Sequence, residues 1–172
     1  MEKLNGADFG KVFRVMEKSF PLDEYRTFEE QKNLLGEDAY QIYVLHGDDG
    51  ESVIAFMAVW EWQKLLFIEH FAVDPSQRNR GIGKRMLHEI VSASDKIACL
   101  EVELPDTEIA VRRIGFYKRC GFFLNEYPYM QPSISKGRSP IPLQIMTYGR
   151  AVSKDEFAEI RDTLYTRVYK QL

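Results

Sequence analysis

The hydrophobic positions at the start of the chain recur at the spacing of an α-helix. In the segment "ADFGKVFRVMEKSF" the apolar residues Phe9, Val12, Phe13 and Met16 share one face, which predicts an amphipathic helix. The segment "TFEEQKNLL" begins with a threonine that a glutamate follows three residues later, which is the signature of a capping box. A second, short helix is therefore expected there.

The pattern then changes to that of β-strands. "YQIYVLH", "SVIAFMAVWEW" and "LLFIEHFAVD" are rich in aromatic and β-branched residues, and "GDDG" supplies hairpin-turn chemistry between the first two. A helix follows with one apolar stripe made of Ile82, Met86, Ile90 and Val91. "IACLEVELP" predicts the next strand, and "EIAVRRIGFYKRC" predicts a helix that ends at Gly121.

Two late strands and a last helix complete the chain. "FFLNEY" and "LQIMTYG" are predicted strands around a polar loop, "PYMQPSISKGRSP", and a capping box starts the helix "SKDEFAEIRDTLYTRVY". Antiparallel strands followed by strand–helix–strand units imply an α/β (α+β) fold. We expect one domain over residues 1–172, with a mixed, mostly antiparallel sheet of about six to seven strands flanked by helices.

Composition narrows the function classes. The net charge is −3, which argues against bulk binding to nucleic acid or to a membrane surface. No apolar run is long enough to span a bilayer, and the first residues lack the apolar core of a signal peptide, so a cytoplasmic protein is expected. Cys99 and Cys120 form no close-spaced motif and the three histidines are scattered, so no metal site is expected.

The densest basic stretch, "RNRGIGKR", combines two glycines with the start of a helix, which is typical of an anion site. A P-loop would need glycine at position 78 and serine or threonine at position 85, where Arg78 and Arg85 stand. A dinucleotide-binding turn would need a third glycine in place of Met86. A plain capped helix with a basic first turn is disfavoured, because cations there oppose the helix dipole.

Arg78-x-x-Gly81-x-Gly83 directly after a strand resembles the acetyl-CoA loop of the GNAT acetyltransferase superfamily. A second motif of that family is similar to Phe116-Tyr117 followed by Gly121-Phe122. The resemblance implies that the coenzyme binds the turn residues Arg78, Asn79, Arg80, Gly81, Ile82, Gly83 and Lys84, and pairs with the main chain of Phe71, Ala72 and Val73. One departure is Ala110, where many members carry an asparagine that contacts the coenzyme.

The resemblance implies direct transfer of an acetyl group from acetyl-CoA to a primary amine, with Tyr117 as the acid that protonates the leaving thiolate. For the base, strand alternation puts Phe67, Glu69, Phe71 and Val73 on one face, and Ile68, His70 and Ala72 on the other. Glu69 ranks first, because desolvation in an aromatic row would raise its pKa. Glu101 and then Glu103, on the next strand, follow, and His70 is more simply a core residue.

The acceptor is expected between the early helices and the late loop, where Tyr127, Tyr129 and Gln131 offer aromatic walls and an amide, with Glu24 and Tyr25 as weaker candidates. We expect a small-molecule amine, and the family's habit allows a homodimer. The alternative from another class is a non-catalytic sensor or interaction module that binds acyl-CoA.

Overall fold

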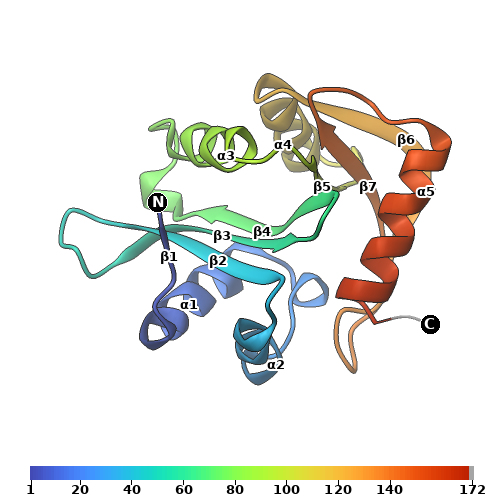
Figure 1. The fold of residues 1–172 in the computed structure, drawn as a ribbon. Coiled ribbons are helices and arrows are strands. Elements are labelled where there is room, and N and C mark those ends of the chain that lie inside the picture. The colour runs from blue at the N-terminus through green and yellow to red at the C-terminus, as the bar shows by residue number, and fades with distance from the viewer. Residues whose placement is uncertain (171–172) are drawn as a thin grey trace.

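A computed structural model describes residues 1–170 as one mixed sheet with helices on both faces (Figure 1). The strand order is β1-β2-β3-β4-β5-β7-β6, in which β4 and β5 pair in parallel and the other neighbours pair antiparallel. The strands are β1 (Glu2–Lys3), β2 (Tyr40–His46), β3 (Val53–Glu61), β4 (Leu65–Val73), β5 (Ile97–Glu103), β6 (Phe122–Gln131) and β7 (Ile141–Tyr148). The helices are α1 (Phe9–Ser19), α2 (Phe28–Asn33), α3 (Ile82–Ser92), α4 (Glu108–Arg119) and α5 (Lys154–Thr163), which a π-helical turn (Leu164–Val168) continues. The expected fold class is confirmed.

Helix boundaries follow the local signals. The capping boxes at Thr27 and Ser153 both form, each with the glutamate three residues later. Gly121 follows α4 with a φ of +91°, a left-handed conformation that favours glycine, and its amide bonds to the Lys118 carbonyl at 3.0 Å. These ends were predictable because each depends on residues close together in the chain.

The helices divide into two layers. The side chains of α1 and α5 bury one face of the sheet around Phe56 and Phe67, whereas α3 and α4 bury the other around Met57 and Leu100. Figure 1 shows α3 and α4 above the sheet and α1 and α2 below it. The sheet therefore separates two hydrophobic cores.

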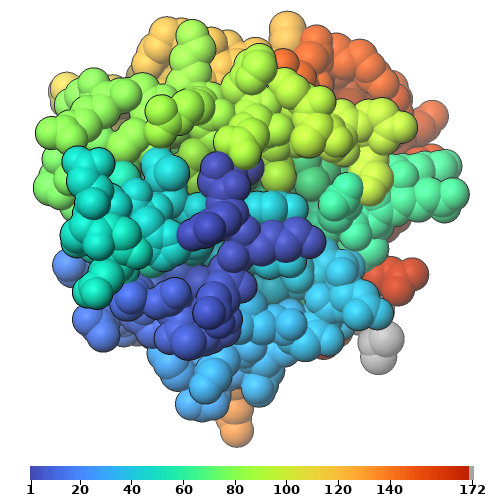
Figure 2. All heavy atoms as spheres, turned by 60° about the vertical axis from the view of Figure 1, so that its left-hand side comes forward, coloured from blue at the N-terminus to red at the C-terminus, as the bar shows by residue number. Residues whose placement is uncertain are grey.

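One strand was not expected. β1 pairs with β2 through Glu2 and Lys3, and the Met1 amino group lies 3.3 Å from a Glu89 carboxylate oxygen on α3. Figure 2 shows the first residues of the chain, in dark blue, lying across the middle of the face that it presents. Two residues are too few to produce an alternating pattern, so no sequence signal predicts this strand.

A β-bulge in β4 changes which side chains share a face. Ala58 pairs with His70 and Val59 pairs with Ile68, so Glu69 has no residue opposite it on β3. The bulge puts Phe67 in the core under α1 and Phe71 against the core under α3. The prediction that Phe67, Glu69, Phe71 and Val73 share one face is therefore wrong, because simple alternation fails across a bulge.

Beyond this bulge, β4 and β5 separate. Their parallel pairing ends at Ile68 and Leu100, while β5 continues to pair with β7 as far as Glu103. β4 beyond Ile68 consequently has no strand partner on its β5 side. A parallel sheet that opens in this way leaves backbone groups of β4 available to a ligand.

The late loop is shorter than predicted. Its first four residues, "PYMQ", extend β6, and Tyr129 pairs with Leu143 while Gln131 pairs with Ile141. Pro128 does not stop the strand, because β6 is an edge strand with irregular register between Asn125 and Tyr129. Through residue 170, no helix has the length and apolar character needed to cross a bilayer.

Candidate active site

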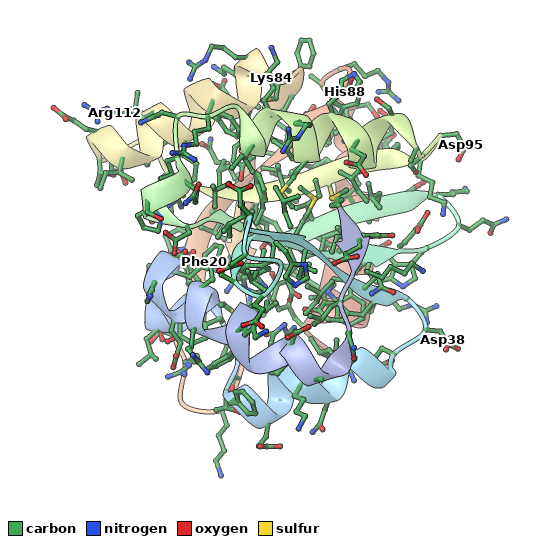
Figure 3. The ribbon with its side chains drawn as sticks, turned by 90° about the vertical axis from the view of Figure 1, so that its left-hand side faces the viewer. Phe20, Asp38, Lys84, His88, Asp95 and Arg112 are labelled. Atoms are coloured by element: carbon green, nitrogen blue, oxygen red, sulfur yellow. The ribbon has the colours of Figure 1, made fainter. Side chains whose placement is uncertain are left out.

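A cleft of about 620 Å³ occupies the gap between the separated strands. It is lined on one side of the sheet by α3 and α4, and on the other by the end of α1 and the turn that follows it. In Figure 3, Lys84 and Arg112 lie above the sheet and Phe20 lies on the side of α1. The cleft thus joins the two faces of the sheet, and the residues that line it differ between its two ends.

The predicted glycine turn forms the end of the cleft under α3. Asn79 and Gly81 have φ angles of +64° and +74°, which turn the chain sharply from β4 into the helix. Ile82, Gly83 and Lys84 line the cleft, and the amides of a helix's first turn have no partners within that helix. Their N–H groups and the positive end of the α3 dipole suit a phosphate.

Gly83 is required by packing rather than by its backbone angle. A Cβ atom there would approach Phe116 Cζ to 3.2 Å and Phe71 Cζ to 3.3 Å. Both rings line the cleft. Any larger residue would displace these rings and change the shape of the cleft at the end beneath the glycine turn.

The basic residues near the turn differ in their orientation. The Arg78 side chain donates from Nε to the Val73 carbonyl at 3.1 Å and lines the cleft. Arg80 donates to Gln77 Oε1 at 3.0 Å and is not among the lining residues. The cations Arg112, Arg113 and Arg119 of α4 also line the cleft, and sequence patterns did not single them out.

Tyr117 reaches the cleft from α4, close to the opening between β4 and β5. Burial, offset in part by Arg113, raises the pKa of Tyr117 to about 12. Tyr117 lines the cleft, and within residues 1–170 its hydroxyl makes no hydrogen bond to another group of the protein. The phenol is neutral at pH 7, as an acid catalyst requires.

Glu69 lies in the cleft wall, but its carboxylate is already bound to two neighbouring side chains. Its Oε1 lies 2.6 Å from Arg26 Nη1, and its Oε2 accepts a hydrogen bond of 3.0 Å from Trp60 Nε1. Burial alone would raise the pKa of Glu69, but the Arg26 charge and these hydrogen bonds lower it below its ordinary value. The prediction that desolvation raises this pKa is wrong, because the sequence did not indicate that Arg26 would lie beside Glu69.

The bulge also turns His70 into the cleft wall. Its Nε2 donates to the Glu24 carbonyl at 2.8 Å, so in the neutral ring Nδ1 is the acceptor. Burial lowers the pKa of His70, with the Glu69 charge opposing that effect. Phe20 packs edge-on against the ring at 5.0 Å. His70 therefore has the contacts of a neutral, positioned core histidine.

Glu101 is at the floor of the cleft, where β4 and β5 part. Its carboxylate accepts hydrogen bonds from the Tyr129 hydroxyl and, at 2.7 Å, from the Tyr169 hydroxyl. Burial raises the pKa of Glu101 to about 7, although the two phenols lower it. Glu101 is therefore an acid–base group poised near neutral pH.

Two further carboxylates line the same end. Burial, with a contribution from the Glu103 charge, raises the pKa of Glu24 to about 7. Glu103 forms an ion pair with α4, in which its Oε2 lies 3.0 Å from Arg113 Nη1. The α1 side of the cleft is therefore acidic, whereas the α3 side is basic.

The expected acceptor residues fall in different places. Gln131 lines the cleft and is buried, and Tyr129 contacts Glu101. The Tyr127 ring packs on Phe157 at 4.8 Å, its hydroxyl donates to the Val152 carbonyl at 3.4 Å, and it does not line the cleft. Tyr127 therefore packs against α5, outside the cleft. Among residues 1–170, no group of three or more metal-ligating side chains is brought together.

The family model described as the Acetyltransferase (GNAT) family matches residues 9–122, which is more than half of the chain. The chain belongs to the GNAT acetyltransferase family. A solved structure of a Bacteroides thetaiotaomicron protein assigned to this family is 32% identical, with a TM-score of 0.85 over 98% of this chain and 97% of that chain. No curated protein sequence matches the chain.

More distant GNAT structures share the fold. Arabidopsis thaliana NAA60 in complex with acetyl-CoA has a TM-score of 0.66 at 16% identity, covering 86% of this chain and 96% of that chain. A spermidine N-acetyltransferase, SpeG, from Vibrio cholerae has a TM-score of 0.63 at 14% identity, covering 86% and 92%. These identities are too low to transfer a substrate.

Proposed function

We propose that this GNAT protein transfers an acetyl group from acetyl-CoA to the primary amine of a small molecule. The observation that carries the proposal is the cleft that crosses the sheet, with phosphate-binding groups at one end and buried acid–base groups at the other. A coenzyme and an amine entering from opposite faces would meet where β4 and β5 separate. The family membership supports the reaction class.

The coenzyme end offers two kinds of contact. The first-turn amides of α3, together with Arg78 and Lys84, suit the phosphates of acetyl-CoA. The main chain of residues 71–73 lacks a strand partner on its β5 side, and can pair with the amides of the pantetheine arm. This arrangement would direct the thioester toward the gap near Tyr117 and Glu101.

We assign the proton acceptor to Glu101 in preference to Glu69. A base is most effective when its pKa is near the working pH, and that of Glu101 is about 7. Glu69 is held ionised by Arg26 and is the weaker base. In the proposed reaction, Glu101 accepts a proton from the ammonium, directly or through water, and the free amine then attacks the thioester carbonyl.

Tyr117 is the proposed acid. As the carbon–sulfur bond breaks, Tyr117 donates its proton to the departing thiolate. The nitrogen loses a proton as the amide forms, and this proton returns to Tyr117 through solvent. Its raised pKa keeps the phenol protonated until the thiolate forms. The products are then an N-acetyl amide, CoA thiol and one released proton.

The surroundings of the acidic end favour a small acceptor. Ser139 N donates to Asp23 Oδ1 at 3.1 Å, and Ser135 hydrogen-bonds to Glu30, so the loop over residues 132–140 is tied to the α1 and α2 layer. A loop attached at two points narrows access from that face. The cleft carboxylates Glu24 and Glu103 and the amide Gln131 are the proposed acceptor contacts.

Calorimetry with acetyl-CoA, followed by an amine screen that detects released CoA with a thiol-reactive dye, tests the proposal. We expect binding in the micromolar range and turnover with at least one amine. Absence of binding at near-millimolar coenzyme would refute the acetyl-CoA assignment.

Ala110 supports one alternative, an acyl-CoA sensor without catalysis. Ala110 is buried and cannot make the side-chain contact that an asparagine makes at this position in many relatives. A sensor would bind the coenzyme but release no thiol with any amine. Turnover that is abolished in Glu101→Gln, with coenzyme binding retained, excludes the sensor.

A further inference from the structure

The π-helical turn Leu164–Val168 and the residue after it are attached to the floor of the cleft at two successive residues. The Val168 carbonyl accepts a hydrogen bond of 3.3 Å from Arg26 Nη2, and the same guanidinium binds Glu69 through Nη1. The next residue, Tyr169, donates its hydroxyl to Glu101 Oε2 at 2.7 Å. The C-terminal turn therefore contacts a carboxylate of β5 directly, and one of β4 through Arg26.

We propose that Tyr169 is a positioning residue for the acetyl transfer, which holds the Glu101 carboxylate in the cleft and sets its proton affinity. This inference rests on the proposed function, because it concerns the group assigned there as proton acceptor. Tyr169 is buried, 7% exposed, so bulk water has little access to the side chain. It sits immediately after the π-helical turn, which ends α5 and directs the ring toward β5.

The geometry explains how the phenol acts. A neutral O–H that donates to a carboxylate stabilises its ionised form and lowers its pKa, and such charge-assisted bonds are among the stronger ones. Burial acts in the opposite direction on Glu101. Without one phenol, the ionised carboxylate would keep the cost of burial and lose a donor, so its pKa would rise further.

Several other groups around Glu101 also affect its pKa. Tyr129 is the second donor, from β6. The charges of Glu69 on β4 and of Glu24 after α1 both raise the pKa of Glu101. Cys99, on the same strand, is buried and its pKa is raised, so it remains a neutral thiol. None of these groups is removed when Tyr169 becomes phenylalanine.

Tyr169→Phe tests the inference, because it keeps the ring and its packing while it removes the hydroxyl. A carboxyl-carbon NMR titration, with the Glu101 signal identified by its loss in Glu101→Gln, should show the Glu101 midpoint move up by about one pH unit. The acid limb of kcat/KM should move by the same amount. At about pH 6 the variant should then lose roughly tenfold in kcat/KM, and should recover most of it at about pH 9.

Tyr165→Phe is the matched control. Tyr165 belongs to the π-helical turn that precedes Tyr169, and its hydroxyl donates to the Met130 carbonyl at 2.6 Å, away from Glu101. It should leave both midpoints unchanged. Tyr129→Phe should raise the Glu101 midpoint as Tyr169→Phe does, because it removes the other donor.

An unchanged Glu101 midpoint in folded Tyr169→Phe protein would overturn the inference, as would an equal shift in Tyr165→Phe. The titration does not need turnover, so it separates two failures. If no amine is acetylated but the midpoint moves, the proposed reaction is wrong while the effect of Tyr169 on Glu101 holds. If amines are acetylated but neither midpoint moves, only the role of Tyr169 is wrong.

Discussion

Arg26 and Glu69 form a buried ion pair, with Arg26 Nη1 2.6 Å from Glu69 Oε1 and side chains only 7% and 2% exposed. The pair joins the turn between α1 and α2 to the bulge of β4. Removing one partner of a buried pair leaves the other charged and desolvated, which costs far more than the loss of a surface pair. This relationship makes a clear prediction about stability.

Arg26→Met should lower the free energy of unfolding by about 3–5 kcal/mol, because Glu69 would remain buried without its cation. Urea denaturation at neutral pH measures the change. The control is Arg161→Met, which breaks an exposed pair with Asp162 and should cost at most about 1 kcal/mol. Equal losses in the two variants would contradict the assigned difference in burial.

Glu101→Gln should make the protein more stable and inactive at alkaline pH. A carboxyl with a folded-state pKa of about 7 binds its proton more tightly than in the unfolded chain, so its contribution to stability falls as pH rises from about 4.5 to 7. The amide has no charge to bury, so we expect a gain of about 1–2 kcal/mol at pH 8.5 and less at pH 5.

Denaturation of wild type and variant at both pH values checks this sign. Glu69→Gln is the contrast, because the pKa of Glu69 is lowered by Arg26 and its ionised form stabilises the fold. That variant should be destabilised at neutral pH. A gain in stability for Glu69→Gln and a loss for Glu101→Gln would reverse the electrostatics described for the cleft.

Gly83→Ala should weaken coenzyme binding by roughly tenfold and lower the free energy of unfolding by about 1 kcal/mol, because the new methyl group would push on Phe71 and Phe116. Calorimetry and denaturation measure the two effects. Gly10→Ala is the control, since a Cβ there meets open space in α1 and should stabilise the helix by up to about 1 kcal/mol. Unchanged affinity in Gly83→Ala would show that the ring positions do not shape the coenzyme site.

Tyr117→Phe should lower kcat by on the order of a hundredfold, because the thiolate would leave without its proton donor. Coenzyme affinity should change little, since the ring remains. Tyr148→Phe, at an exposed position on β7, serves as the control and should keep wild-type turnover. Full activity in Tyr117→Phe would remove this residue from the reaction.

Much of the fold was predictable from short stretches of sequence. The capping boxes at Thr27 and Ser153, the turn at Gly81 and the helix end at Gly121 each depend on residues within one or two turns of one another. The two motifs that resemble the family's are also local. They predicted the glycine turn that lines one end of the cleft, because that turn belongs to one strand–turn–helix unit.

The acid–base end depended on contacts between distant segments. Strand alternation could not reveal the bulge at Glu69, since a bulge is defined by its register with β3. No pattern linked Arg26 to Glu69, or Tyr169 to Glu101 across 68 positions of sequence. The sequence by itself therefore determined most of the elements, the family and the glycine turn. Only the tertiary structure decided that Glu69 is paired with a cation and that the pKa of Glu101 is about 7. The reason is that a pKa depends on burial and on neighbouring charges that folding brings together.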